Sequence, residues 1–201
     1  MPDIITAIPM LGLAALAGYL LGSIPFGIVM ARIFGLGDLR AIGSGNIGAT
    51  NVLRTGNKPA AFLTLILDAG KGGIAVLFAR MALGEDAAQI AGFFAFLGHC
   101  YPIYLRFKGG KGVATWLGTL LVLSWPMGLA ACATWLVTAL LFRVSSLAAL
   151  SAAAFSPLWA YLLGVPEMIA LLGAFGLLIF YRHRANISRL IAGEEPRIGK
   201  K

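Results

Sequence analysis

The chain has 201 residues, of which 59% are hydrophobic and only 12% are charged. A soluble domain is about half apolar and about a quarter charged, so this composition excludes an ordinary soluble protein. Its long apolar runs predict a single-domain, all-α integral membrane protein over residues 1–201 and not a barrel of short alternating strands. The formal net charge of +8 points to an anionic partner or a basic membrane face, and no nucleic-acid partner is expected.

Seven apolar segments follow one another along the chain, and several approach the roughly 20 residues that span a bilayer. The fourth is too short to cross alone at about 1.5 Å per residue, unless the loop before it dips into the membrane. Pro126 favours a break after this segment, and one long kinked helix over 113–142 is the alternative. The segments cover residues 4–31, 59–83, 87–105, 113–124, 126–142, 146–163 and 166–181.

The basic residues predict the orientation of these segments. With about seven crossings and the N-terminus outside, 14 of the 16 Lys and Arg residues fall inside, which leaves Arg80 outside and Lys71 in the membrane. Cytoplasmic loops carry such an excess of basic residues. We therefore expect a cytoplasmic C-terminus, with residues 186–201 as a basic tail.

The first polar loop runs from Gly43 to Arg54, between the first two apolar segments. Its glycines let backbone N–H groups converge on an anion, and Arg54 adds a fork of charged donors suited to phosphate. The pattern Gly43-x-Gly45-x-x-Gly48 follows a transmembrane segment and not a strand, so it does not indicate a dinucleotide site. We expect an anion-binding loop, with a flexible interhelical loop as the alternative. Its side-chain donors are Ser44, Asn46, Thr50 and Asn51.

The second polar loop, from Arg106 to Thr115, combines three glycines with three basic residues. A helix is expected to begin just after it, and the N-terminus of a helix favours a phosphate group. The loop is not a Walker A motif, because the upstream glycine and a Ser or Thr directly after the lysine are missing. The alternative is a basic loop attracted to anionic lipid headgroups. The expected phosphate-binding residues are Lys108, Gly109, Gly110, Lys111, Gly112 and Thr115.

The third polar region begins at His183 and Asn186, which are three residues apart and would share one face of a helix. His183 could act as a base or as a donor to an oxyanion. The alternative is a basic amphipathic tail that lies on the lipid surface.

Two further pairs of polar residues have open interpretations. Asp68 and Lys71 lie inside the second apolar segment, where charges are costly and face a cavity or each other. They form either a structural ion pair or part of a functional site. Ser145 and Ser146 either cap a helix or contact a substrate, and His99 is expected to be structural.

The sequence has few of the residues that covalent or metal-dependent catalysis needs. It has no Gly-x-Ser-x-Gly elbow, and its predicted inner face carries few carboxylates. We therefore expect no metal and no cofactor, and a site that holds one or two phosphates at a membrane surface.

In their order along the chain these motifs resemble the acyl-phosphate-dependent glycerol-3-phosphate acyltransferases, the PlsY family of bacteria. The resemblance covers essentially the whole chain and departs at Ile47, where many members carry Pro. It implies transfer of an acyl chain from acyl phosphate to the 1-hydroxyl of glycerol 3-phosphate, which gives lysophosphatidic acid and inorganic phosphate. It also implies a multi-pass protein of the bacterial inner membrane, with the N-terminus in the periplasm and an acyl-phosphate-producing enzyme as a partner. The matching segments are 43–54, 68–72, 98–115, 145–147 and 183–190, with Gly193 and Glu195.

The resemblance and the residue chemistry together suggest roles. Ser44, Arg54 and Lys111 would hold phosphates, and Asn186 would orient the glycerol or the reacting carbonyl, together with the amide and hydroxyl groups of the first loop. His183 is the best protein candidate to take the hydroxyl proton, and the acceptor's own phosphate is the alternative. Glu195 would organise the C-terminal segment by pairing with a nearby Arg or Lys.

Two other functions compete with the enzyme. A small transporter of an anionic metabolite would use Asp68 and Lys71 as an intramembrane relay. A non-catalytic lipid-binding scaffold would use its basic loops to attract headgroups.

Overall fold

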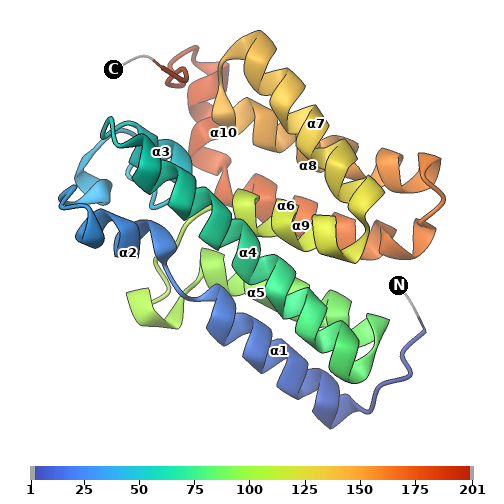
Figure 1. The fold of residues 1–201 in the computed structure, drawn as a ribbon. Coiled ribbons are helices and arrows are strands. Elements are labelled where there is room, and N and C mark those ends of the chain that lie inside the picture. The colour runs from blue at the N-terminus through green and yellow to red at the C-terminus, as the bar shows by residue number, and fades with distance from the viewer. Residues whose placement is uncertain (1–2, 200–201) are drawn as a thin grey trace.

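The computed structural model describes residues 3–199, and every regular element in that range is helical. Each of the seven apolar segments contains at least one helix (Figure 1). In chain order the elements are α1 (Ile8–Gly22), α2 (Phe26–Ile33), η1 (Leu39–Ala41), α3 (Ala49–Leu53), α4 (Lys58–Leu83), α5 (Glu85–Cys100), η2 (Ile103–Leu105), α6 (Val113–Leu123), α7 (Trp125–Phe142), α8 (Ser145–Leu162), η3 (Pro166–Met168), α9 (Ile169–Arg182) and α10 (Arg184–Ile191).

Four helical stretches are long and apolar enough to cross a membrane, namely residues 8–33, 58–83, 125–142 and 145–162. The count rises to five when residues 166–191, which bend by 63°, are taken as one span. Figure 1 shows α2, α3 and α10 together at one end of the molecule and the α8–α9 connection at the other. The polar loops of the sequence therefore meet at one end of a helical membrane protein.

The first apolar segment, residues 4–31, contains a break between two helices. Helix α1 ends at Gly22 and α2 begins at Phe26, because Pro25 lacks an N–H group and disrupts the helical hydrogen bonds. The Lys71 ammonium donates to the carbonyl of Ile24 at 2.8 Å. The ammonium of the intramembrane Lys71 thus bonds a backbone carbonyl that lies in the break between the two helices.

The fourth and fifth segments are two helices and not one kinked helix. Helix α6 ends at Leu123, and α7 begins at Trp125 with Pro126 in its first turn. Gly128 lies against the backbone of Leu121, so α7 folds back on α6. Since α6 has 11 residues, it is only about 16 Å long.

Glycines allow the helices around α6 to approach closely. A side chain at Gly118 of α6 would overlap the backbone of Ala69 in α4, and one at Gly72 of α4 would overlap Thr115. Close backbone contact through small residues is how membrane helices pack without a hydrophobic driving force. This contact places the loop before α6 beside α4.

Aromatic packing then positions α9. The rings of Phe96 in α5 and Phe175 in α9 meet edge to face at 5.2 Å, in a cluster that also buries Trp116 and Leu172 completely. Such edge-to-face pairs add to the burial of apolar area. Helix α9 is therefore held against α5, and Arg182 at its C-terminal end reaches the loop before α6.

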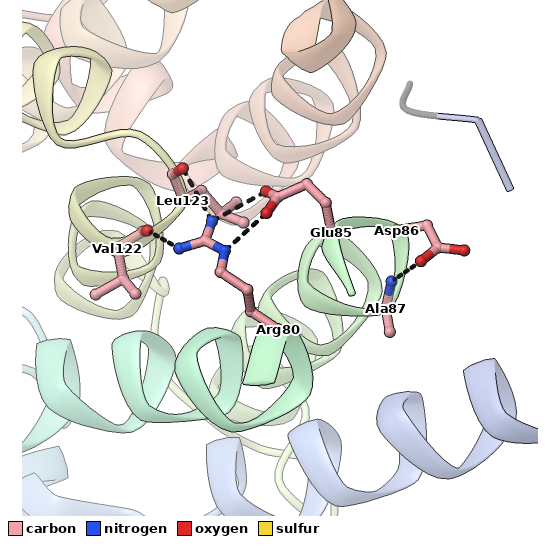
Figure 2. A network of polar contacts seen from close by, with 6 residues as sticks. All are labelled: Arg80, Glu85, Asp86, Ala87, Val122 and Leu123. Atoms are coloured by element: carbon pink, nitrogen blue, oxygen red, sulfur yellow. Dashed lines mark hydrogen bonds and ion pairs between the residues drawn. The ribbon is translucent and has the colours of Figure 1, made fainter. Parts of the chain in front are cut away.

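At the opposite end, Arg80 links three helices (Figure 2). Its guanidinium donates to the carbonyls of Val122 and Leu123 at 2.6 and 3.0 Å and pairs with Glu85 at 2.7 Å. The last carbonyls of a helix have no partner within it. Arg80 of α4 thus caps α6 next to the α4–α5 turn.

Candidate functional site

One cavity of about 620 Å³ lies where the polar loops meet. Its polar end receives side chains from the first loop, the loop before α6, the start of α8 and the α9–α10 junction. Much of the rest of its wall is apolar and comes from α4, α6 and α7, including Phe62, Leu65, Leu117, Leu121 and Trp135. The cavity therefore joins a polar, cationic end to an apolar groove between membrane helices.

Asn51 organises the first loop. Its amide nitrogen donates to the Leu39 carbonyl at 2.8 Å, and its oxygen accepts from the Ser44 N–H at 3.1 Å and from Arg54 at 3.3 Å. Gly43 has φ of 51°, and a side chain there would strike Asn51 and Arg54. Because both amide groups of the buried Asn51 are engaged by protein, its structural role is to place Ser44 and Arg54 in the cavity wall.

Other residues of this loop also reach the cavity. Asn46 and Thr50 line it, and the Asn46 oxygen accepts from the Ile47 N–H at 2.9 Å. Thr50 and Ser145 lie 3.3 Å apart, which joins the first loop to α8. Ile47, the position where the sequence departs from the family pattern, is buried with 3% of its surface exposed.

Arginines hold the loop before α6 through its carbonyl groups. Arg40 donates to the Lys108 carbonyl at 2.8 Å, and Arg182 donates to the carbonyls of Gly109 and Gly110 at 2.9–3.1 Å. The loop ends at Gly112, whose φ is 81°, and α6 begins at the next residue. Lys111, Gly112, Val113 and Ala114 line the cavity, whereas Lys108, Gly109, Gly110 and Thr115 are not among its lining residues.

Lys111 is the central cation of the cavity. Its ammonium donates to the Asn186 oxygen at 2.5 Å. Burial lowers its pKa to about 8, against a smaller opposite effect of the Glu195 carboxylate. A lysine with this pKa is charged at neutral pH and able to hold a phosphate.

The third region forms a hydrogen-bonded cluster around Glu195. The Glu195 carboxylate accepts from Asn186 at 2.5 Å and from Ser146 and Arg189 at 2.7 Å. Burial alone would raise the pKa of this carboxyl, but its hydrogen bonds outweigh burial and lower it. Glu195 therefore pairs with Arg189, as expected, and joins α8 to α10.

His183 occupies the bend between α9 and α10. Its Nδ1 lies 2.8 Å from the Ile179 carbonyl. A carbonyl can only accept, so Nδ1 carries the proton and Nε2 is left as an acceptor. Burial lowers the pKa of the imidazole to about 4, with a further contribution from the charge of Lys111. His183 and Asn186 both line the cavity, although a bend and not one continuous helix brings them there.

Asp68 and Lys71 form an intramembrane ion pair at 2.8 Å, and each is only 2% exposed. Asp68 and His99 line the floor of the cavity, while Lys71 faces the break between α1 and α2. His99 Nδ1 lies 3.4 Å from Asp68, and the His99 carbonyl accepts from the Gly110 N–H at 3.0 Å. Through its carbonyl His99 supports the loop before α6, and its structural role stays a prediction because His99 also lines the cavity.

The structure decides other details that sequence patterns left open. Within residues 3–199 no side chain caps α8, and Ser145 and Ser146 contact Thr50 and Glu195. The supporting roles of Arg40 and Arg182 were missed. The only available signal for Arg182 was its place directly before His183, and the basic cluster there also fits a lipid-facing tail.

These features define a helical membrane protein whose cavity has a phosphate-compatible end and an apolar groove. The chain belongs to the glycerol-3-phosphate acyltransferase family, whose sequence profile matches residues 12–193.

Similar proteins span nearly the whole chain. A glycerol-3-phosphate acyltransferase of Jannaschia sp. strain CCS1 is 70% identical over 99% of this chain and 98% of its own length. The protein of that name from Dinoroseobacter shibae is 63% identical over 100% of this chain and 99% of its own length. The crystal structure of PlsY, an integral membrane glycerol 3-phosphate acyltransferase, in its glycerol 3-phosphate form has a TM-score of 0.88 and 42% identity, covering 94% of this chain and 96% of PlsY. Its lysophosphatidic acid form has a TM-score of 0.85 and 39% identity over 94% and 95%.

Proposed function

We propose that this protein transfers an acyl chain from acyl phosphate to the 1-hydroxyl of sn-glycerol 3-phosphate. The products are 1-acyl-glycerol 3-phosphate and inorganic phosphate. Membership of the glycerol-3-phosphate acyltransferase family supports glycerol 3-phosphate as the acceptor. The two similar PlsY structures are a glycerol 3-phosphate form and a lysophosphatidic acid form. The observation that carries the proposal is one cavity with Arg54 and Lys111 at its polar end and an apolar groove beyond.

The residues suit a reaction that needs no covalent enzyme intermediate. Acyl phosphate is a mixed anhydride with a good leaving group. The glycerol oxygen attacks the carbonyl carbon, the bond from that carbon to the phosphate oxygen breaks, and the phosphate leaves with the electron pair. Ser44, Arg54 and Lys111 hold phosphates and stabilise the developing charge. Asn46, Thr50 and Asn186 line the same wall and orient the glycerol or the carbonyl.

The hydroxyl proton passes to the phosphate of glycerol 3-phosphate and not to His183. A general base works best when its pKa lies near the working pH, and burial lowers the pKa of His183 to about 4. The second pKa of a phosphate monoester is about 6, which is a better match. His183 instead orients the acceptor through Nε2.

Substitution of His183 tests this assignment. We expect His183→Ala to reduce kcat at saturating substrates by about tenfold or less, since removal of a general base costs about a hundredfold or more. A loss of that larger size in a well-folded variant would return the role of base to His183.

We propose that the chain is a single domain that crosses the bacterial inner membrane seven times, with its N-terminus in the periplasm. Hydrogen bonds support it, because they join loops that this topology places on one side: Arg40 to Lys108, Thr50 to Ser145, Arg182 to Gly110 and Ser146 to Glu195. At the other side Arg80 joins the ends of α4 and α6. A membrane-associated enzyme that makes acyl phosphate is the partner this reaction requires.

The decisive experiment uses purified protein in detergent or lipid with palmitoyl phosphate and glycerol 3-phosphate. We expect equal amounts of lysophosphatidic acid and free phosphate, both lost in Arg54→Ala and Lys111→Ala. A parallel reaction with palmitoyl-CoA tests the donor class. Folded protein that makes no product from either donor would overturn the proposed function.

A further inference from the structure

We infer that Arg182 is a positioning residue that sets the conformation of the phosphate loop, residues 108–112. The inference rests on the proposed function for its kinetic consequence and on contacts of Arg182 for its structural content. Arg182 Nε and Nη2 donate to the Gly110 carbonyl at 3.1 and 2.9 Å, and Nη2 also donates to the Gly109 carbonyl at 3.0 Å. One guanidinium thus engages two successive peptide groups of the loop.

These bonds determine where the loop's N–H groups point. In a trans peptide the C=O and the following N–H point in opposite directions. With the Gly109 carbonyl directed at Arg182, the Gly110 N–H must point away, and it bonds the His99 carbonyl at 3.0 Å. The Gly110 carbonyl also points at Arg182, so the Lys111 N–H of the same peptide group points away from Arg182.

Arg182 is itself held in place from behind. Its guanidinium stacks on the Tyr101 ring at 4.9 Å, and the Tyr101 carbonyl accepts from the Tyr19 hydroxyl at 2.7 Å. Within residues 3–199 no carboxylate forms an ion pair with Arg182. Its charge is therefore directed to the loop carbonyls and is not neutralised by an acid.

The α9–α10 junction consequently fixes Lys111 at two points. Arg182 holds the peptide before Lys111, and Asn186 accepts from its ammonium at 2.5 Å. A loop with glycines at 109, 110 and 112 loses much conformational entropy when it is ordered. Arg182 imposes that order before the substrate arrives, which favours binding of the phosphate.

Arg184 provides a matched control two residues away. It stacks on Tyr181 at 4.7 Å and donates to the Tyr181 carbonyl at 3.3 Å, so it has the same kind of aromatic and carbonyl partners. The ring and the carbonyl both belong to Tyr181 of the adjacent helix α9 and not to the phosphate loop. Removal of Arg184 therefore changes the local charge equally but leaves the loop untouched.

The test compares Arg182→Lys and Arg182→Ala with Arg184→Lys and Arg184→Ala in the purified full chain. Lysine keeps the charge but lacks the planar fork. We therefore expect the KM for the substrate whose phosphate this loop holds, palmitoyl phosphate or glycerol 3-phosphate, to rise about tenfold or more in Arg182→Lys. The Arg184 variants should stay within about twofold of wild type. Millimolar guanidinium, but not ammonium, should restore part of the activity of Arg182→Ala.

Hydrogen exchange separates this inference from the proposed function. The amides of residues 108–112 should exchange faster in both Arg182 variants than in wild type or the Arg184 variants, whether or not any protein is active. Unchanged exchange of these amides, or an Arg182→Lys variant with wild-type KM for both substrates, would overturn the inference. If an Arg182 variant fails to fold, Tyr101→Leu removes the supporting ring and should shift exchange and KM in the same direction.

Discussion

At the scale of single residues, His183 and Lys111 are two titratable groups of the cavity whose environments make one neutral and the other charged at neutral pH. His183 donates from Nδ1 to a backbone carbonyl and is neutral, because burial lowers its pKa to about 4. Lys111 remains charged at neutral pH, with its pKa lowered to about 8. The lysine can therefore attract a phosphate while the imidazole acts as a neutral hydrogen-bonding group.

The lowered pKa of Lys111 predicts an alkaline limit to activity. The ammonium is charged below pH about 8 and neutral above it. The kcat/KM for the substrate whose phosphate Lys111 holds, palmitoyl phosphate or glycerol 3-phosphate, should therefore fall as pH rises through about 8. The measurement is a pH profile of kcat/KM with a no-enzyme blank for donor hydrolysis. Lys111→Arg should lose this descending limb, since a guanidinium stays protonated beyond pH about 12. A variant with the same limb as wild type would assign it to another group.

At the scale of elements, α6 connects the two ends of the molecule. Its N-terminal turn lines the cavity, and its C-terminal carbonyls at Val122 and Leu123 accept from Arg80 (Figure 2). Glycine contacts with α4 hold its middle. Because it is short, its position depends on these contacts more than on its own apolar length.

Arg80 should therefore contribute to stability through the α6 carbonyls. Arg80→Gln leaves two carbonyls at the helix end without their charged donor, so we expect the free energy of unfolding to fall by about 1–3 kcal/mol. Glu85→Gln is the matched control, because it removes a half-exposed ion pair worth at most about 1 kcal/mol and leaves the carbonyl bonds intact. Thermal unfolding in one detergent measures both. Equal effects of the two substitutions would mean that the ion pair, and not the capping of α6, is the stabilising contact.

At the scale of the whole molecule, the polar loops are gathered at one end and α6–α7 and α8–α9 turns lie at the other (Figure 1). This arrangement lets a phosphate group stay at the membrane surface while an acyl chain enters the groove between α4, α6 and α7. The excess of basic residues predicts that the cavity end faces the cytoplasm.

The orientation predicts which engineered thiols react from outside the cell. In a background with Cys100 and Cys132 replaced by Ala, Glu167→Cys at the α8–α9 turn should react with an impermeant maleimide on spheroplasts. Glu194→Cys, after α10, should react only after the membrane is opened; both positions are exposed. The reverse labelling pattern would mean the opposite topology, and labelling of both from outside would mean that α9 does not cross the membrane.

Sequence patterns located the cavity's polar segments but not the function of each residue within them. Asn51 stood out as a polar donor beside Thr50, yet its amide is engaged by Leu39, Ser44 and Arg54. Nothing in the local sequence separates these two neighbours. The difference arises because the first turn of α3 directs Asn51 inward, where it is 1% exposed.

The amino-acid sequence by itself determined the helical membrane class, the seven apolar segments and the three loops rich in glycine and polar groups, because composition and hydrophobic length are local properties. It also predicted that Glu195 pairs with a nearby Arg or Lys, and the structure identifies that partner as Arg189. Only the tertiary structure decided that Lys111 meets Asn186, 75 positions away, and that Ser146 meets Glu195, 49 positions away. Those meetings follow from close helix contacts at Gly72 and Gly118 and from the bend at His183. Such contacts depend on how whole helices pack, which residue spacing along one segment does not encode.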